Sequence, residues 1–362
     1  MSIFNEIQEM GHEQVVFNYD EATGLKAIIA IHDTTLGPAL GGCRFWDYKN
    51  EDEAIKDVLR LSRGMTYKAA VAGLALGGGK AVIIGDAKKL KSEALFRAFG
   101  RFVNGLNGRY ITAEDVNVNT SDIEAVSMET QYCSGIAGAS GDPSPITALG
   151  VYVGIQASVL HKLKKDSLKG LTVAVQGTGH VGSWLCRYLH EEGASLIVAD
   201  IDQGRLDKMA TEFGAKIVGT DEIHKVDCDV FAPCALGFGL NDDTIPEIKA
   251  PIVAGGANNQ LLDESRHGEM IRKRDILYAP DYVINAGGLI NVYHELRGYN
   301  AEAAKRQARN IKGTLLEIYR EAEEQDIGYH IASDVIAERR IKSIKSMADL
   351  RKNYNNQSWI RR

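Results

Sequence analysis

The sequence predicts an α/β protein of two domains, and three observations lead to this prediction. The chain has 362 residues, which is enough for two domains of ordinary size. Residues 138–145 combine small side chains, glycine and two of the seven prolines, as expected of a connection between larger units. Beyond residue 170, short apolar runs alternate with helical segments, which is typical of a parallel sheet with crossover helices. We therefore place the domain boundary between residues 142 and 143.

The first domain, residues 1–142, mixes strand-like and helix-like segments. Residues 24–31 read as a strand, and residues 53–62 place apolar side chains at helical spacing. A second amphipathic helix is expected to begin near Ser92, which can cap it, because residues 95–106 repeat apolar side chains three and four positions apart. A further apolar run at residues 81–84 predicts another strand.

The second domain, residues 143–332, carries the alternating pattern. Its predicted strands are residues 171–175, 195–199, 215–218, 229–232, 252–254 and 276–279. Residues 289–325 read mostly as helix, and a last helix is expected to begin near Ser333. We expect this C-terminal helix, residues 333–362, to pack back on the first domain.

Composition excludes several classes of protein. The formal net charge of −6 leaves no basic excess for nucleic acid, and the 25% of charged residues is ordinary for a globular chain. Five scattered cysteines without a C-x-x-C pair indicate a reducing compartment, and nine histidines without an H-E-x-x-H motif give no support to a metal site. The first residues do not resemble a secretory signal, and no apolar stretch long enough to span a membrane is expected. A cytoplasmic protein is the prediction.

A glycine motif marks the first strand of the second domain. The predicted strand at residues 171–175 runs into GTGHVG at residues 177–182, and a helical segment follows. In such a G-x-G-x-x-G turn, Gly177 allows the tight turn, Gly179 lets the backbone approach a pyrophosphate and Gly182 permits close packing of helix on strand. Binding of a dinucleotide is therefore predicted.

Asp200 strengthens this prediction, because it ends the next predicted strand about twenty residues further on. A carboxylate at that position can accept hydrogen bonds from the adenosine ribose and repels a 2′-phosphate, which favours NAD over NADP. Arg205 is a nearby cation that leaves NADP open. The alternative to a cofactor site is an ordinary glycine turn in which Asp200 caps a helix.

Two lysines lie among small and apolar residues in the first domain. Lys80 follows the glycines at residues 77–79, and Lys68 precedes it by twelve residues. The cluster fails the spacing of a phosphate-binding P-loop, since the lysine comes one residue late and Ala81 follows it. The glycines suggest backbone held close to a small ligand. If both ammonium groups face one pocket, burial and mutual repulsion lower the pKa of one of them.

One lysine could then bind a carboxylate while the other acts as a base. The alternative is a pair of surface lysines. Asp115 follows an apolar run at residues 110–113 and is a candidate for proton transfer, although such a residue is more often a helix cap.

These motifs together resemble the amino acid dehydrogenase family that includes glutamate, leucine, phenylalanine, valine and tryptophan dehydrogenases. The resemblance covers nearly the whole chain and is closest to the leucine dehydrogenases. It is carried by the segments at residues 37–42 (GPALGG), 64–68 (GMTYK), 77–80 (GGGK), 110–115 (YITAED), 143–147 (PSPIT), 177–182 (GTGHVG), 254–259 (AGGANN) and 282–288 (YVINAGG).

The resemblance implies an N-terminal substrate-binding and oligomerisation domain and a C-terminal Rossmann-type NAD domain, separated by an active-site cleft. Lys80 would be the catalytic lysine, Asp115 its proton-transfer partner and Lys68 the ligand of the substrate α-carboxylate. The implied cofactor residues are Gly177, Thr178, Gly179, His180, Val181, Gly182, Asp200, Thr147, Cys234, Ala235, Asn258 and Asn285. The implied reaction is the reversible oxidative deamination of an amino acid to a 2-oxo acid and ammonium.

The resemblance also maps a side-chain pocket. Its residues are Leu40, Gly41, Gly42, Met65, Ala113, Leu289 and Val292. Glutamate dehydrogenases carry a lysine at the position of Leu40, so a dicarboxylic substrate is disfavoured here and leucine, valine or isoleucine is expected. Selectivity among these should be graded, because one methylene contributes only about 1 to 3 kcal/mol.

Two other functions remain open. Residues 10–15 and 114–118 also resemble tryptophan dehydrogenases, so an aromatic amino acid, tryptophan or phenylalanine, is the second substrate hypothesis. A catalytically silent NAD-binding regulator is less favoured, because both lysines and Asp115 are present. A homo-oligomer, octamer or dimer, is implied by the resemblance.

Overall fold

The computed structural model describes residues 3–135 and 141–356, with side chains described as far as residue 347. The chain divides into two compact units. Unit 1 comprises Met1–Gly141 and Ala337–Arg362, and unit 2 comprises Asp142–Ile336. The division falls within the connection expected at residues 138–145, of which residues 138–140 lie outside the described part.

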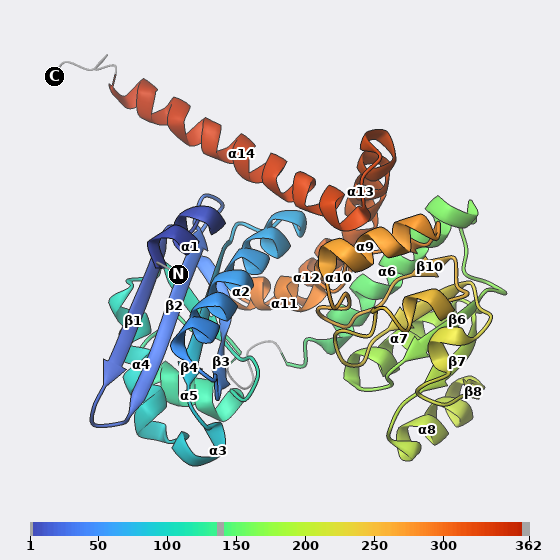
Figure 1. Cartoon of the computed structure of the whole chain (residues 1–362), viewed down its shortest axis with the longest axis horizontal. Coiled ribbons are helices and arrows are strands. Elements are labelled where there is room, and N and C mark those ends of the chain that lie inside the picture. The colour runs from blue at the N-terminus through green and yellow to red at the C-terminus, as the bar shows by residue number, and fades with distance from the viewer. Residues whose placement is uncertain (1–2, 136–140, 357–362) are drawn as a thin grey trace. The chain divides into compact units, whose positions relative to one another are not determined.

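Unit 1 is built around one mixed sheet (Figure 1). Its elements are α1 (Ile3–Met10), β1 (Gln14–Asp20), β2 (Leu25–Asp33), β3 (Ala39–Trp46), α2 (Glu51–Val71), β4 (Gly77–Ile84), α3 (Ala87–Leu90), α4 (Glu93–Gly105), β5 (Tyr110–Ala113) and α5 (Thr120–Ser127). The strand order is β1-β2-β4-β3-β5. The pairs β1/β2 and β2/β4 are antiparallel, whereas β3 pairs in parallel with both β4 and β5.

Alternation along β2 explains how this sheet separates two apolar layers. Ile29 and Ile31 join the core that includes Phe96 and Phe99 of α4, while Ile28 and Ala30 join the core formed with α2. Successive side chains of a strand point to opposite faces, so one strand serves both layers.

The two main helices of unit 1 begin where side chains can cap them. Asn50 accepts a hydrogen bond from the backbone N–H of Glu53 at the start of α2, and three acidic residues occupy its first turn. The predicted cap Ser92 accepts from the N–H of Leu95 at the start of α4, as expected from the sequence.

Unit 2 alternates strands and helices around a second sheet. Its elements are α6 (Ser144–Leu163), β6 (Thr172–Gln176), α7 (His180–Glu191), β7 (Ser195–Ala199), α8 (Gln203–Phe213), β8 (Lys216–Ile217), the 3-10 helix Ile223–Lys225, β9 (Val230–Pro233), the 3-10 helix Ile245–Glu247, β10 (Ile252–Val253), α9 (Glu264–Lys273), β11 (Leu277–Tyr278), α10 (Asp281–Ile284), α11 (Gly287–Glu295), α12 (Ala301–Arg309), α13 (Ile311–Gln325) and α14 (Tyr329–Asn356).

The six strands of unit 2 form a parallel sheet in the order β11-β10-β9-β6-β7-β8. This is the doubly wound order of a Rossmann-type domain. Chain order reverses between β6 and β9, and ligands of such sheets bind at that point, beyond the carboxyl ends of the strands. The glycine motif follows β6 and the segment with Cys234 and Ala235 follows β9, so both lie at the reversal.

Helix α6 corrects the expectation that no apolar stretch could span a membrane. Its 20 residues have the length and hydropathy of a membrane span. The helix nevertheless packs against α7, α11, α12 and α13, and 61% of its apolar window is buried inside the protein. Its apolar composition is explained by its place in the core of unit 2.

The last helix belongs to both units. Helix α14 begins at Tyr329, four residues before the predicted start at Ser333, and residues from 337 onward count with unit 1. There Glu338 accepts a hydrogen bond of 2.9 Å from the Tyr67 hydroxyl, and Arg340 donates to the carbonyls of Ala69, Ala70 and Leu74. These contacts hold the tail on the C-terminal end of α2. Residues 357–362 of the predicted helix lie outside the described residues.

Candidate active site

Lys80 and Asp115 form a close ion pair in unit 1. Lys80 lies on β4, Asp115 follows β5, and β3 lies between these two strands in the sheet. The Lys80 Nζ atom is 2.6 Å from Asp115 Oδ2, and the side chains are 8% and 22% exposed. The two residues proposed from the sequence for proton transfer are therefore within direct proton-transfer distance.

Glycine at position 42 makes this approach across β3 possible. A Cβ atom on Gly42 would lie 2.2 Å from the carbonyl oxygen of Glu114 and 2.9 Å from the Cβ of Asp115. Any larger residue would push the segment that carries Asp115 away from the sheet.

Protein atoms also occupy the space beside the other glycines of this region. A Cβ on Gly41 would lie 1.8 Å from the carbonyl oxygen of Gly79, and one on Gly78 would lie 2.1 Å from the backbone nitrogen of Thr66. Residues 77–79 form the start of β4. Strands and α2 pack into the space beside these glycines, and the approach of a ligand to their backbone stays a prediction.

Asp115 is held in its ionised form by two cations. Burial raises the pKa of its carboxyl group, but the charge and hydrogen bond of Lys80 and the charge of Arg44 outweigh burial, and the pKa lies below its ordinary value. The carboxylate is therefore available as a proton acceptor at neutral pH.

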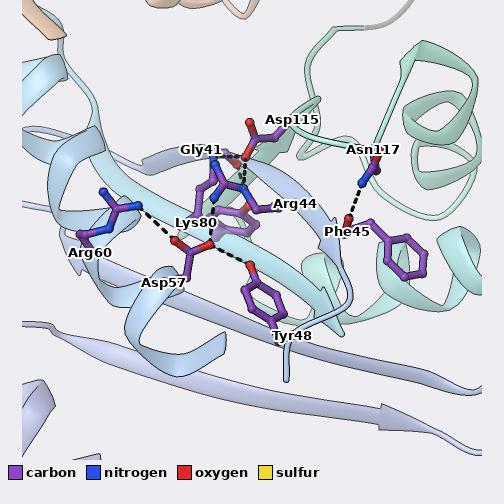
Figure 2. A network of polar contacts seen from close by, with 10 residues as sticks. Gly41, Arg44, Phe45, Tyr48, Asp57, Arg60, Lys80, Asp115 and Asn117 are labelled. Atoms are coloured by element: carbon purple, nitrogen blue, oxygen red, sulfur yellow. Dashed lines mark hydrogen bonds and ion pairs between the residues drawn. The ribbon is translucent and has the colours of Figure 1, made fainter. Parts of the chain in front are cut away.

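Arg44 was not foreseen from the sequence. Its Nε atom is 3.3 Å from Asp115 Oδ2, and its Nη1 atom is 2.9 Å from Asp57 Oδ2 (Figure 2). The Tyr48 hydroxyl donates to the same oxygen of Asp57 at 2.8 Å. The only signal in the sequence was a single charged residue inside the apolar strand at residues 39–46.

The predicted substrate residues are divided between the two units. Leu40 on β3 is buried, Gly42 pairs with Ala113 of β5, and Met65 and Lys68 lie half-buried on α2. Helix α2 packs on β4 at Gly78, opposite Thr66. Leu289 and Val292 are on α11 of unit 2. The common pocket of Lys68 and Lys80 stays a prediction.

The glycine motif of unit 2 has the geometry that its sequence predicted. Gly177 has a φ of +93°, which L side chains rarely adopt. A Cβ on Gly182 would lie 2.0 Å from the carbonyl oxygen of Gly177, so α7 packs closely on the turn. A Cβ on Gly179 would meet only the Arg205 guanidinium at 3.8 Å. Gly179 therefore presents backbone to open space at the start of α7, as the approach of a phosphate requires.

Asp200 is tied to this turn. Its Oδ2 atom accepts hydrogen bonds from Thr178, from the N–H at 2.6 Å and from the hydroxyl at 3.0 Å, and its Oδ1 atom accepts from the N–H of Asp202. These bonds outweigh burial and lower the pKa of the Asp200 carboxyl group. The cap of α8 is Asp202 rather than Asp200, so the alternative of a helix cap does not apply.

Several other predicted cofactor residues gather around the turn. Cys234 and Ala235 lie against it, since a Cβ on Gly177 would be 2.9 Å from the Cβ of Ala235. Cys234 accepts a hydrogen bond from the N–H of Gly256, and burial raises the pKa of its thiol to about 11. His180 is exposed and Val181 half-buried in the first turn of α7.

Two of the remaining cofactor residues, Asn258 and Asn285, form a polar pair beside Gly256. The Asn285 amide donates to Asn258 Oδ1 at 2.7 Å and to the carbonyl of Gly256. Asn285 is 4% exposed, and within the described part of the chain its Oδ1 atom accepts no hydrogen bond. Thr147 lies in the first turn of α6, and its hydroxyl would be 3.1 Å from a Cβ on Gly288. A buried acceptor without a partner fits an N–H donor on a ligand, such as the carboxamide of NAD.

Comparison with known proteins gives consistent matches over both units. The model of the Glu/Leu/Phe/Val dehydrogenase dimerisation domain matches residues 12–132, and that of Glutamate/Leucine/Phenylalanine/Valine dehydrogenase matches residues 138–204 and 198–350. Leucine dehydrogenase of Bacillus subtilis (strain 168) is 54% identical over 348 residues, which cover 95% of each chain.

A second group of relatives carries a different substrate in its name. L-tryptophan dehydrogenase of Nostoc punctiforme is 52% identical over 345 residues, covering 95% of this chain and 98% of the relative. The crystal structure of L-tryptophan dehydrogenase from Nostoc punctiforme matches with a TM-score of 0.89 and 51% identity, covering 95% of this chain and 100% of that one.

Proposed function

The chain belongs to the glutamate/leucine/phenylalanine/valine dehydrogenase family, and we propose that it deaminates branched-chain aliphatic L-amino acids. It is an NAD-dependent amino acid dehydrogenase. The products are the 2-oxo acid, ammonium and NADH, and the reaction is reversible. The observation that carries the proposal is the Lys80–Asp115 pair in unit 1 of a chain whose unit 2 has the dinucleotide turn.

In this proposal NAD, held at the turn of residues 177–182, would supply the hydride acceptor for the substrate Cα, and the side chains of unit 1 handle the protons. Lys68 binds the α-carboxylate. Lys80 first passes its proton to Asp115 across 2.6 Å and then takes a proton from the water that attacks the iminium carbon. Lys80 returns this proton to the amino nitrogen and takes the hydroxyl proton of the carbinolamine as the C–N bond breaks. The 2-oxo acid and ammonia leave, and ammonia becomes ammonium in water. Such positioned proton transfer typically contributes a factor of about 10² to 10⁴ to the rate.

The cofactor is proposed to lie on the turn at residues 177–182. The open backbone at Gly179 supports contact with the pyrophosphate, Asp200 is placed to bind the adenosine ribose, and the free acceptor of Asn285 supports contact with the carboxamide. Asp200 would repel a 2′-phosphate, which supports NAD over NADP. Arg205 beside Gly179 is a feature that would favour NADP.

The preference for an aliphatic side chain rests on Leu40. This residue is only 3% exposed on β3, so a substrate carboxylate placed beside it would lose its hydration without gaining a partner. Leu289 and Val292, on α11 of unit 2, are further aliphatic pocket residues that the family resemblance implies. An aromatic substrate is the second candidate, and the 52% identity to an L-tryptophan dehydrogenase favours it.

Initial rates of NADH formation separate these substrates. Leucine, valine, isoleucine, phenylalanine, tryptophan and glutamate are compared at equal concentration, each with NAD and with NADP. We expect the largest kcat/KM with leucine and NAD, with valine and isoleucine following within a factor of about 200. A larger kcat/KM for tryptophan or phenylalanine would establish the aromatic alternative, and turnover of none of them would contradict the proposed reaction.

Two further properties are part of the proposal. A homo-oligomer, dimer or octamer, is supported by the match of residues 12–132 to a dimerisation domain, and light scattering measures its mass. A cytoplasmic location is proposed from the composition and the five free cysteines.

A further inference from the structure

We propose that Arg44 is a positioning residue of the active site, which orients Asp115 toward Lys80 and whose fixed positive charge sets the pH range in which the pair transfers protons. The inference rests on the proposed function, because it assigns a role within that reaction. It concerns a residue that the motif analysis did not assign.

The first step of the argument is geometric. Arg44 and Lys80 both contact the same oxygen, Oδ2, of Asp115, at 3.3 Å and 2.6 Å. Lys80 approaches from β4 and Arg44 from β3, so the carboxylate is held by two cations on neighbouring strands. A side chain held at one oxygen from two directions has little freedom to rotate away from Lys80.

The second step is that Arg44 is itself fixed from behind. Its Nη1 atom pairs with Asp57 Oδ2 at 2.9 Å, and Asp57 lies on α2 with 16% of its side chain exposed. Tyr48 donates to Asp57 Oδ2, and Arg60 reaches Asp57 Oδ1 at 3.2 Å (Figure 2). The planar guanidinium group is thereby anchored at two nitrogen atoms, a geometry that a lysine ammonium cannot reproduce.

The third step concerns charge. The charged or titratable groups that face Asp115 are Lys80 of β4, Arg44 and Cys43 of β3, Tyr110 of β5 and, behind Arg44, Asp57 of α2 with Tyr48. Burial raises the pKa values of the Cys43 thiol and the Tyr48 and Tyr110 hydroxyls, so these three stay neutral at ordinary pH. Arg44 remains charged throughout. Its charge is thus a constant field on a pair that gains and loses protons.

Removing the charge of Arg44 shifts the proton affinity of Asp115 and of Lys80 in the same direction. A neutral residue at position 44 raises the pKa of any nearby group that can bind a proton, carboxyl or ammonium. The acidic limb of the profile of kcat/KM against pH reports the group of the free enzyme that must be deprotonated. The limb therefore moves to higher pH whichever member of the coupled pair it reports.

The test measures this limb in the full-length protein with leucine and NAD. We expect Arg44→Gln to move it upward by about one pH unit, the lower end of the effect of an opposite charge within contact distance. Arg44→Lys keeps the charge and should recover most of the shift, while its kcat stays below that of the wild type because the anchored fork is lost. Arg101→Gln is the matched control, since Arg101 has a 67% exposed side chain and pairs with Glu129 rather than with Asp57 or Asp115. Its limb should coincide with that of the wild type.

Folding of each variant is checked by circular dichroism and by NAD titration. A lowered kcat in Arg44→Gln with an unmoved acidic limb would show a merely structural role and overturn the proposal, as would an equal shift in Arg101→Gln. A turnover-independent readout is the carbon-13 titration of aspartate carboxyl resonances, with the Asp115 signal identified by its loss in Asp115→Asn. An increase in the midpoint pH at which that resonance titrates in Arg44→Gln supports the proposal even if the substrate panel shows no amino acid turnover. That failure would instead count against the proposed function. If the Asp115 titration is unchanged, the proposal is wrong.

Discussion

At the scale of single residues, Lys80 and Arg44 both contact the carboxylate of Asp115. Lys80 and Asp115 stand 35 positions apart in the chain, and their motifs predicted a shared role that the 2.6 Å contact makes physically reasonable. Arg44 could not be selected in the same way, because a lone arginine in an apolar strand does not reveal which carboxylates it will meet. Its partners, Asp57 and Asp115, come from a helix and from the end of another strand.

Loss of the Asp115 charge should separate catalysis from cofactor binding. In Asp115→Asn, Lys80 loses the acceptor with which it exchanges a proton, so we expect kcat to fall by about 10² or more while the affinity for NAD changes less than twofold. Steady-state kinetics and fluorescence titration with NAD measure the two quantities. Asp86→Asn, at the cap of the short helix α3, is the control and should keep wild-type kcat. Near-normal kcat in Asp115→Asn would remove Asp115 from the mechanism.

A buried histidine predicts how stability depends on pH. His12 is 8% exposed, and burial, with the nearby His32, lowers its pKa from 6.5 to about 4. Between these values the unfolded chain binds more protons than the folded one, so the free energy of unfolding falls as pH drops below 6.5. At pH 5 this contribution is at most about 2 kcal/mol.

Urea unfolding at pH 7 and pH 5 measures this dependence. His12→Gln preserves a donor toward the Leu59 carbonyl but cannot titrate, so it should lose less stability on acidification than the wild type. An identical loss in both proteins would assign the pH dependence to other groups.

At the scale of elements, the sequence predicted the strands of unit 2 and the cap of α4, but it did not predict which segments pack closely. The strands of unit 2 lie within one or two residues of their predicted positions. A short apolar run between two helical segments is typical of a buried strand. The strand predicted at residues 81–84 begins earlier, at Gly77, and includes all three glycines. Three consecutive glycines usually indicate a turn, and only tertiary contacts with Thr66, Asp33 and Tyr110 explain them here.

Two glycine substitutions, one on β4 and one on α2, test this packing. In Gly78→Ala the new methyl group would meet the backbone nitrogen of Thr66 at 2.1 Å, so β4 and α2 must separate, and we expect a destabilisation of about 3 kcal/mol or more. Gly64 lies within α2, and a methyl group added there would meet nothing within 4 Å, so Gly64→Ala should stabilise by about 0.5 to 1 kcal/mol. Denaturant midpoints measure both changes, and equal midpoints would contradict the packing argument.

At the scale of the whole molecule, the two units are not two continuous halves of the chain, and the sequence predicted this only in part. A tail packing back on the first domain was predicted, and the structure counts residues from 337 onward with unit 1. The specific contacts of that tail, such as Arg340 with three carbonyls at the end of α2, have no local signature. Unit 2 is continuous in sequence, whereas unit 1 is assembled from two separate segments.

This difference predicts unequal behaviour of fragments. A fragment of residues 142–336 contains all of unit 2 and should melt cooperatively and bind NAD. A fragment of residues 1–141 lacks Glu338 and Arg340. The carbonyls of Ala69, Ala70 and Leu74 lose their hydrogen bonds from Arg340 in it, so it should be markedly less stable than the same segment in the full chain. Calorimetry and NAD titration provide the comparison. A fragment of residues 1–141 as stable as the intact unit would show that the tail contributes nothing.

The assembly of unit 1 from two segments also has a consequence for biosynthesis. Protein domains generally fold as they leave the ribosome, the N-terminal one first. Here the first segment emerges early but lacks the tail that covers the end of α2, while unit 2 is complete before that tail is translated. Unit 1, with the Lys80–Asp115 pair, is therefore expected to finish folding last although its first strands are made first, and nascent chains stalled before residue 337 would expose it to chaperones and proteases.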